Sequence, residues 1–438
     1  MTFPALGREL VLEIADLNHA GEGVGRHDGL VVFVPFALPG ERVRAVVEEA
    51  RKSYLRARLK ELLSPSPRRV TPPCPFFGSC GGCSLQHLDY DGQLRFKEKV
   101  VENALLRLGR LGEVRVRGTL GMEDPWRYRC KVRFHVVREG GRLALGLYAP
   151  GSHAPGYLTS KGPCLILDGR LNALARALGE LLRERAAFLA GLAAVTLRVA
   201  PGTGEAMVVL EGEGTGGHLQ ELARELAGVM PVASVVWLRA TGEEEVLHGE
   251  GAITARLGHL VFRLSATSFF QVNPAQTLVL YRKVAEYAAL SGRERVVDAY
   301  CGVGTIALYL AGQAGSVLGL EVLPRAVADA RANAAINGAR NAAFACGTAE
   351  RLLPGILRRG PVPEMVVLDP PRAGCRRPVL EALAAAKVPR VIYVSCDPAT
   401  LARDLGVLAG AYRVVEVQPV DMFPQTRHVE CVALLEAR

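Results

Sequence analysis

The sequence lacks the features that would remove it from the class of soluble globular proteins. It has no uninterrupted apolar run long enough to span a bilayer, and no apolar leader segment follows the first residues. Tandem repeats and low-complexity tails are also missing. A hydrophobic content of 49% with 22% charged residues is typical of folded domains rather than of disorder. We therefore expect a folded cytoplasmic protein that acts away from membranes.

The chain has fewer acidic than basic residues. The 53 Lys and Arg residues exceed the 44 Asp and Glu residues, which gives a formal net charge of +9 and favours an anionic partner. Part of the excess is local, because residues 51–70 contain seven basic side chains against one acid, Glu61. A nucleic-acid-binding surface and an ordinary solvated basic face would both have this composition, so charge alone leaves the two interpretations open.

The chain is too long for one ordinary hydrophobic core, and its 438 residues indicate two or three domains. Residues 9–62 contain short strand-like runs separated by turn signals such as Asp28-Gly29, a pattern typical of a small β-barrel of the OB type. From Gln271 onward strands and helices alternate, which predicts an α/β domain with a doubly wound parallel sheet. A proline-rich linker, residues 64–67, follows the barrel.

A glycine-rich loop, residues 298–305, lies between a predicted strand and a predicted helix. Gly302 and Gly304 would let the backbone approach a ligand at the start of that helix. Glu321 ends the next predicted strand, where a carboxylate commonly accepts the hydroxyl groups of a ribose. Alone, Glu321 could be a surface acid, but together with the loop it favours an adenosine-containing cofactor. Both NAD and S-adenosylmethionine fit this pattern.

A rigid turn follows the predicted strand Met365–Leu368. It begins with Asp369, continues with two prolines and ends with Arg372. Such a turn can present a carboxylate and backbone carbonyls to a planar base, although it could simply end the strand. Enzymes that methylate exocyclic amines typically carry an aromatic residue where this chain has Arg372, so the turn points away from amine methylation.

Cys396 follows a buried strand-like run and precedes the turn signature Asp397-Pro398. Open α/β sheets place their chemistry at such carboxyl ends of strands, whereas a buried core cysteine is the common alternative. Glu430 comes 34 residues later, behind its own strand, and could lie beside Cys396 or be a solvated surface acid. A thiol with a pKa of about 8.5 reacts only when its thiolate is stabilised. We interpret the pair as a candidate nucleophile and a candidate base.

A cysteine cluster follows the linker. Cys74, Cys80 and Cys83 fall within ten residues, and Cys164 is a possible fourth member. Ten cysteines in a chain expected to be cytoplasmic do not indicate a disulfide framework. Zinc and a [4Fe–4S] cluster both accept four thiolates, although the spacing is not that of a zinc ribbon. The residues alone leave both metals open.

Taken together, these motifs resemble the RNA 5-methyluridine methyltransferases, S-adenosylmethionine-dependent enzymes of class I. Residues 9–62 resemble their TRAM domain, residues 74–87 resemble their iron–sulfur signature, and the C-terminal motifs match as far as Glu430. The resemblance implies a Rossmann-like methyltransferase domain behind an OB-like TRAM barrel and a central α+β iron–sulfur and RNA-binding domain. The implied boundaries are residues 1–62 for the barrel, 63–92 with 118–264 for the central domain, and 93–117 with 265–438 for the methyltransferase domain.

The resemblance also assigns roles to residues. Cys396 matches the family's nucleophile and Glu430 its base. The positions that match cofactor contacts are Gln271, Tyr300, Gly302, Gly304, Thr305, Glu321 and Asp369. The implied ligands of a [4Fe–4S] cluster are Cys74, Cys80, Cys83 and Cys164. Two positions depart from the pattern: Thr305 stands where some members have Asn, and Cys130 stands where the family often has Asn in a motif on the RNA side.

The TRAM barrel and the cysteine signature together resemble the enzymes that act on ribosomal RNA. The resemblance therefore implies a monomeric enzyme that methylates a uridine of 23S ribosomal RNA, with transfer RNA as the alternative substrate. Two rival interpretations are a non-catalytic iron–sulfur RNA-binding protein and an NAD-dependent enzyme. The intact Cys396 and Glu430 argue against the first, and the Asp369 turn argues against the second.

The chemistry explains why such an enzyme needs both groups. C5 of uracil is a poor nucleophile, and addition of a thiolate to C6 makes it reactive by forming an enolate. After methyl transfer, a base must remove the C5 proton before the thiolate can leave. A uracil inside a duplex is inaccessible, so we expect the target base to be unpaired or flipped out.

Overall fold

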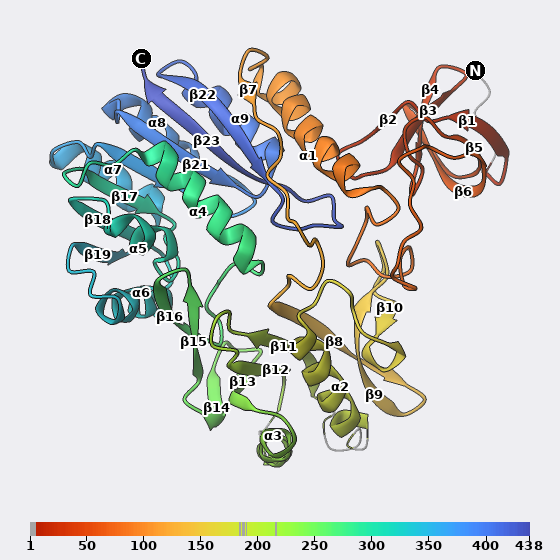
Figure 1. Cartoon of the computed structure of the whole chain (residues 1–438), viewed down its shortest axis with the longest axis horizontal. Helices are drawn as coiled ribbons and strands as arrows, with labels where there is room; N and C mark the ends of the chain where they lie inside the picture. The colour runs from red at the N-terminus through yellow and green to blue at the C-terminus, as the bar shows by residue number, and fades with distance from the viewer. Residues whose placement is uncertain (1–5, 184, 186–188, 190, 215–216) are drawn as a thin grey trace.

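The structure is a computed structural model that describes residues 6–183, 185, 189, 191–214 and 217–438. Figure 1 shows the N-terminal strands and the C-terminal sheet on either side of helix α1 (Tyr90–Ala104), with the central sheet below them. Among the described residues, no helix has both the length and the apolar composition needed to cross a membrane.

The N-terminal unit is a curved sheet of six strands that confirms the predicted OB-like barrel. The strands pair in the order β1-β5-β6-β4-β3-β2, and their alternating residues enclose a small apolar core. Leu10 and Leu12 on β1, for example, are buried while their neighbours are exposed. The strands are β1 (Glu9–Glu13), β2 (Asp16–Leu17), β3 (Gly23–His27), β4 (Leu30–Val34), β5 (Arg42–Ala50) and β6 (Tyr54–Ser64).

Carboxylates neutralise much of the basic stretch at the end of the barrel. Arg51 donates to Glu49 at 2.6 Å and Arg58 donates to Glu48 at 2.7 Å. Two further ion pairs in the same strands follow the same pattern, Arg56 with Glu22 and Lys60 with Glu9. The local positive excess read from the sequence is therefore smaller on the folded surface than residues 51–60 suggest.

The barrel is fastened to the cysteine segment, which we define as residues 74–88. The carboxylate of Glu41, fully buried, accepts hydrogen bonds from Arg69 and from the backbone N–H groups of Leu38 and Ser66. Beside this pair, the Phe36 ring of the barrel packs edge-on against Phe77, with ring centroids 5.3 Å apart. The ion pair thus anchors Arg69, which bridges to Leu88 at the end of the cysteine segment, and the aromatic contact anchors Phe77 within it.

The central unit is a seven-stranded sheet in the order β10-β9-β8-β11-β12-β13-β14. Helices α2 (Gly169–Arg183) and α3 (Gly217–Val229) pack on it and share its apolar core. Its strands are β8 (Lys131–Glu139), β9 (Arg142–Tyr148), β10 (Pro155–Leu158), β11 (Leu192–Val199), β12 (Ala206–Gly212), β13 (Val232–Arg239) and β14 (Glu244–Gly249). A separate hairpin of β15 (Ala252–Leu257) and β16 (Leu260–Ser265) follows and packs against α6 (Pro324–Ile336) of the C-terminal unit.

The C-terminal unit confirms the predicted Rossmann-like fold. Its eight strands lie in the order β19-β18-β17-β20-β21-β23-β22-β7, and the five from β19 to β21 are parallel. Their sequences are almost continuously apolar because both faces are covered, as in other doubly wound sheets. The strands are β7 (Arg115–Val116), β17 (Arg295–Ala299), β18 (Ser316–Glu321), β19 (Ala342–Cys346), β20 (Met365–Leu368), β21 (Arg390–Ser395), β22 (Tyr412–Val420) and β23 (Glu430–Ala437).

Helices divide between the two faces of this sheet. One apolar core contains side chains of α6 together with α4 (Pro274–Ala288) and α5 (Thr305–Ala311). The other contains side chains of α1, α7 (Ala349–Arg359), α8 (Arg377–Ala386) and α9 (Pro398–Leu408). Helix α1 is capped by Asp89, continues as a π-helical turn at Leu105–Gly109 and packs against α9. The following strand β7 then pairs with β22, so residues from early in the chain complete the C-terminal sheet.

Candidate active site

Cys396 and Glu430 meet at one edge of the C-terminal sheet. Strand β23 runs antiparallel to β21, with Ser395 opposite Cys431. The next pair in this register is Cys396 with Glu430, which places the thiol and the carboxyl group side by side. Glu430 is only 3% exposed, whereas Cys396 is partly exposed and therefore reachable from solvent.

A tight strand-to-helix turn ends β21 at Cys396. The Asp397 side chain caps α9 by accepting hydrogen bonds from the N–H groups of Ala399 at 2.9 Å and Thr400 at 3.0 Å. Pro398 occupies the first turn of the helix, where its missing N–H costs nothing. The Ser395 hydroxyl accepts from the Asp397 N–H at 3.2 Å. Local sequence therefore fixes Cys396 at the carboxyl end of its strand.

Burial and like charges dominate the electrostatics of this pair. Burial raises the pKa of the Cys396 thiol to about 11, and the nearby Glu430 and Asp369 carboxylates act in the same direction. Burial also raises the pKa of Glu430 to about 8 and that of Asp369 to about 7. Arg372 opposes these shifts at Cys396 and Glu430. Two carboxyl groups here can thus exchange protons near neutral pH, as general bases must.

The glycine-rich loop lies at the same edge of the sheet, where it follows β17, two strands away from β21. Gly302 and Gly304 adopt φ values of 55° and 85°, which favour glycine. A Cβ at Gly302 would meet no atom within 4 Å, so the backbone there faces open space, whereas one at Gly304 would meet Phe344 at 3.0 Å. The Gly302 N–H donates to Glu321 at 3.1 Å. The arrangement leaves room for a ligand between the loop and the end of β18.

Sequence reasoning did not single out Asp298 as a site residue. Its side chain near the end of β17 is fully buried, and the Ala307 N–H acts on it from nearby. Within the described part of the chain, however, neither carboxylate oxygen has a partner in good hydrogen-bond geometry. Burial together with the charges of Asp369 and Glu321 raises its pKa well above the usual range. A buried acceptor without a partner is costly unless a ligand supplies a donor. The signal in the sequence was an acid that ends a buried strand directly before the glycines.

The remaining cofactor candidates surround this space. The Thr305 hydroxyl accepts from Tyr281 at 2.7 Å, and Tyr300 has a left-handed backbone with φ of 69°. Gln271 is 8% exposed in the segment before α4. The carbonyl of Val272, its neighbour, accepts from the N–H of Cys130 at 2.8 Å. Cys130 is itself buried, and its thiol lies 3.7 Å from the Gln271 carbonyl, so this departure from the family pattern lies directly behind the Gln271 segment.

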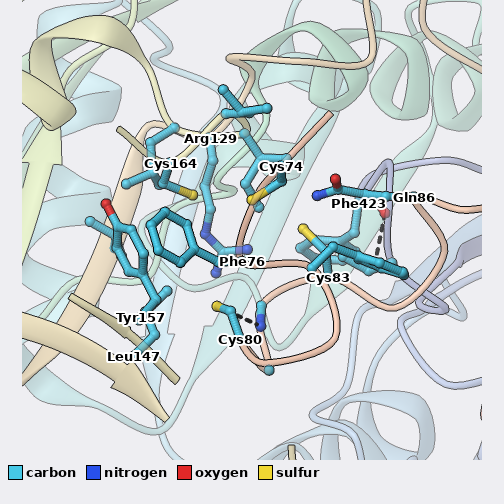
Figure 2. A pocket seen from close by; sticks show the side chains of 18 of the residues that line it. Cys74, Phe76, Cys80, Cys83, Gln86, Arg129, Leu147, Tyr157, Cys164 and Phe423 are labelled. Carbon is cyan, nitrogen blue, oxygen red and sulfur yellow. Dashed lines mark hydrogen bonds between the residues drawn. The ribbon is translucent and has the colours of Figure 1, made fainter. Parts of the chain in front are cut away.

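The four candidate cluster ligands line one cavity of about 350 Å³, together with Phe76, Leu147 and Tyr157. Figure 2 shows their side chains around this space, where Cys80 also accepts from the Gly82 N–H at 3.4 Å. Burial raises the pKa of Cys83 to about 12 and that of Cys164 to about 11. Within the residues that the structure describes, no three His, Cys, Asp or Glu side chains form a group suited to a metal ion. Arg372, Phe423 and His428 border the same cavity, which therefore adjoins the catalytic edge.

The loop from Asp421 to Val429, which we name the base loop, leads directly into Glu430. Lys97 of α1, fully buried, donates to the Asp421 carboxylate and to the Phe423 carbonyl, the latter at 3.0 Å. The Tyr90 hydroxyl donates to the same carboxylate at 2.8 Å. No sequence pattern indicates this pair, because a lysine in an amphipathic helix is expected to be solvated. An ion pair this deeply buried is costly to break, since the remaining charge would lose its partner.

Known proteins resemble the chain over almost its full length. Residues 243–438 match the tRNA (uracil-5-)-methyltransferase family, and residues 5–60 match the TRAM domain. An uncharacterised RNA methyltransferase of Halalkalibacterium halodurans is 43% identical, over 97% of this chain and 96% of the relative. Another from Caldanaerobacter subterraneus is 41% identical over 98% of both chains. The solved Pyrococcus abyssi tRNA (uracil-54, C5)-methyltransferase, bound to S-adenosyl-L-homocysteine, is 28% identical with a TM-score of 0.73, over 97% of this chain and 100% of that one.

Alkylation of Cys396 should report on its charged neighbours. The raised pKa of about 11 means that its reaction with iodoacetamide should be slow at pH 8 and should rise through pH 10. Glu430 is deprotonated above a pH of about 8, and its charge then disfavours the thiolate. Glu430→Gln should therefore lower the pKa of Cys396 and speed alkylation at pH 9. Peptide mass spectrometry measures this rate, with the exposed Cys346 as the internal control. A wild-type midpoint below pH 8.5 would contradict these electrostatics.

Proposed function

We propose that this chain, which belongs to the RNA (uracil-5-)-methyltransferase family, methylates C5 of a uridine through a transient covalent bond between Cys396 and C6 of the base. The proposal is supported by the register of β21 and β23, which pairs Ser395 with Cys431, the residues next to Cys396 and Glu430, and by the effect of the Glu430 charge on the pKa of Cys396. The glycine-rich loop lies at the same edge of the sheet. A nucleophile, a base and a space for a ligand thus share one edge of the sheet.

The residues divide the reaction between them. The partly exposed Cys396 thiol loses its proton to solvent, and its thiolate forms a bond to C6 of the uracil ring. The electron pair of the C5–C6 double bond moves into an enolate that makes C5 nucleophilic. S-adenosylmethionine, when bound, supplies the methyl group that C5 accepts. The Glu430 carboxylate then takes the C5 proton, the double bond re-forms, and the C6–sulfur bond breaks to release Cys396. A carboxyl group with a pKa of about 8 is a better base for this step than an ordinary glutamate.

The residues around the glycine-rich loop fit S-adenosylmethionine. Asp298 offers a buried acceptor that a ligand ammonium group would satisfy, and Glu321 stands where ribose hydroxyls are bound in such folds. Asp369 lies at the start of the turn after β20, where it can face a planar nucleobase. The other proposed contacts are Gln271, Tyr300, Gly302, Gly304 and Thr305.

A second cavity, of about 1290 Å³, fits the RNA. It runs between the barrel, the cysteine segment and the hairpin of β9 and β10, and it reaches Arg427 and His428 of the base loop. Lys161 lines it as well, together with Arg56 and Arg58, which are paired with Glu22 and Glu48 of the same lining. Basic side chains thus follow a path that ends at the base loop. Phosphate contacts of this kind position an RNA strand without specifying its sequence.

We propose a uridine of 23S ribosomal RNA as the target, because the chain combines the TRAM barrel with the cysteine segment. Transfer RNA is the second candidate, and the full-length likeness to the Pyrococcus abyssi tRNA enzyme favours it. Mapping 5-methyluridine by mass spectrometry in both RNAs, from cells with and without this chain, separates the two. We expect loss of one or more modified positions in 23S RNA, while loss confined to transfer RNA would overturn this part of the proposal.

We propose that Cys74, Cys80, Cys83 and Cys164, which line one cavity, hold a [4Fe–4S] cluster. A cluster of this kind takes four thiolate ligands, as a structural zinc ion can. A metal would also stabilise the thiolates against the burial that now favours neutral thiols.

The wider organisation of the enzyme follows from these assignments. We propose that residues 1–62 form the RNA-binding barrel, that residues 63–92 with 118–264 form the central domain, and that residues 93–117 with 265–438 carry the chemistry. Helix α1 and strand β7, which pack on the C-terminal sheet, support the last assignment. We further propose a monomer that acts in the cytoplasm, where its RNA substrates are.

RNA that carries 5-fluorouridine at the target tests the covalent step. The fluorine at C5 cannot leave as a proton does, so the adduct with Cys396 should persist as a complex that survives denaturation. Cys396→Ala should form no such complex. Glu430→Gln should accumulate a methylated complex on ordinary RNA while turnover falls by about 10²–10⁴-fold. A persistent complex with Cys396→Ala would sink the assignment of the nucleophile.

The cluster predicts a chromophore and bound iron. Protein purified without oxygen should be brown and should contain iron and sulfide, and Cys83→Ser should lose both together with stability, because metal binding contributes folding free energy. Cys346→Ser, an exposed cysteine outside the cavity, is the control and should keep the colour. Metal analysis that finds about one zinc and no iron would favour a zinc site instead.

A further inference from the structure

Gln425, in the middle of the base loop, has its backbone N–H, its backbone carbonyl and its side-chain oxygen all hydrogen-bonded. It is 3% exposed, and its backbone has φ of 69°, a conformation that residues other than glycine rarely adopt. Its N–H donates to Oε1 of Gln93 at 3.0 Å, while its own Oε1 accepts from Nε2 of Gln93 at 3.0 Å. Its carbonyl accepts from the N–H groups of Ser84 and Leu85, both at 3.0 Å. Strained backbone persists only where its surroundings determine it this strongly.

Gln93, on helix α1, holds this loop through its side-chain amide. Its Oε1 accepts from the Gln425 backbone N–H, and its Nε2 donates both to the Gln425 side-chain oxygen and to the Leu88 carbonyl, the latter at 2.9 Å. Gln93 is 1% exposed, so water cannot replace these bonds. The buried Lys97 fixes the start of the same loop from the next turn of α1.

These hydrogen bonds, which we call the clamp, join three parts of the molecule that lie far apart in the sequence. Gln93 comes from α1, Ser84 and Leu85 come from the cysteine segment, and Gln425 comes from the loop five residues before Glu430. A further contact, from the Arg427 N–H to the Ser84 hydroxyl at 2.9 Å, repeats the link between the cysteine segment and the loop. A shift of the loop would therefore move Glu430 relative to the reacting base, while Cys396, fixed by its own turn, would stay in place.

We propose that Gln93 and Gln425 are positioning residues that hold the base loop so that Glu430 can remove the C5 proton. The proposal rests on the proposed function, in which Glu430 acts after Cys396. It predicts a defect confined to the late step: bond formation by Cys396 proceeds, and release of the methylated product slows.

The test compares Gln93→Leu with wild type in two assays. Turnover on uridine RNA should fall by about 10- to 100-fold, because a misplaced catalytic group loses that much. The covalent complex with 5-fluorouridine RNA should form at the wild-type rate, and a methylated complex should accumulate on uridine RNA. The KM for RNA should change less than twofold. Gln93→Glu, which keeps an acceptor for the Gln425 N–H, should recover part of the turnover.

Gln220→Leu provides the matched control. Gln220 donates to the Leu247 carbonyl at 2.8 Å in the central unit, away from the base loop, so its loss removes a glutamine hydrogen bond without moving Glu430. Turnover of this control should stay within twofold of wild type. The double variant Gln93→Leu with Gln425→Leu should be no worse than either single variant, since both break one clamp.

Each of the following outcomes would contradict the positioning role of Gln93 and Gln425. Each can also be told apart from a failure of the proposed function. Equal losses of adduct formation and turnover in Gln93→Leu would make the pair a general structural contact. Turnover within twofold of wild type would remove the role altogether. If Gln93→Leu fails to fold, Gln93→Asn keeps the amide but shortens its reach, and the same two assays apply. Failure of wild type itself to form the 5-fluorouridine complex would instead contradict the proposed function.

Discussion

The antiparallel insertion of β23 beside β21 is the constraint on which the site depends. A parallel sheet delivers only the carboxyl ends of its strands to the ligand edge. A strand that runs the other way begins at that edge, so its first residue, Glu430, can stand beside Cys396, which follows the last residue of β21. Cys396 is thereby fixed by the strand and turn that carry it, while Glu430 stands where the base loop enters β23 and depends on both the strand pairing and the loop. This arrangement leaves the rest of the edge free for the glycine-rich loop and Asp369.

The price of this geometry is a concentration of acidic groups in a buried space. Cys396, Glu430 and Asp369 each have a raised pKa, because burial disfavours their charged forms. Repulsion from neighbouring carboxylates adds to this effect at Cys396 and Glu430. Arg372 is the cation that opposes both effects at Cys396 and Glu430. An arginine after the two prolines therefore has an electrostatic role that an aromatic residue could not fill, which gives a physical reason for the departure noted in the sequence.

Local signals in the sequence were sufficient for much of the fold and for the placement of Cys396. The alternation of strands and helices after Gln271 predicted the doubly wound sheet, and Asp397-Pro398 predicted the turn that ends β21. The residues that hold the base loop could not be found in this way. Gln93 and Gln425 are 332 positions apart, and a polar residue on a helix reads as solvated until its distant partner is known. Asp298 was hidden for a related reason, because a lack of partners is visible only in three dimensions.

The barrel illustrates the same limit for charge. Its basic stretch suggested an RNA-binding surface, but Arg51, Arg56, Arg58 and Lys60 each face a carboxylate. Exposed pairs of this kind are worth only about 0–1 kcal/mol, so a phosphate can displace the carboxylate. This exchange still gains less free energy than the contact of a phosphate with an unpaired cation, because in the exchange one anion only replaces another. Lys161, which lines the same groove and has no carboxylate partner within the described residues, has no such competitor. The position of a cation in the groove, and not the local count of cations, thus decides what the RNA backbone meets.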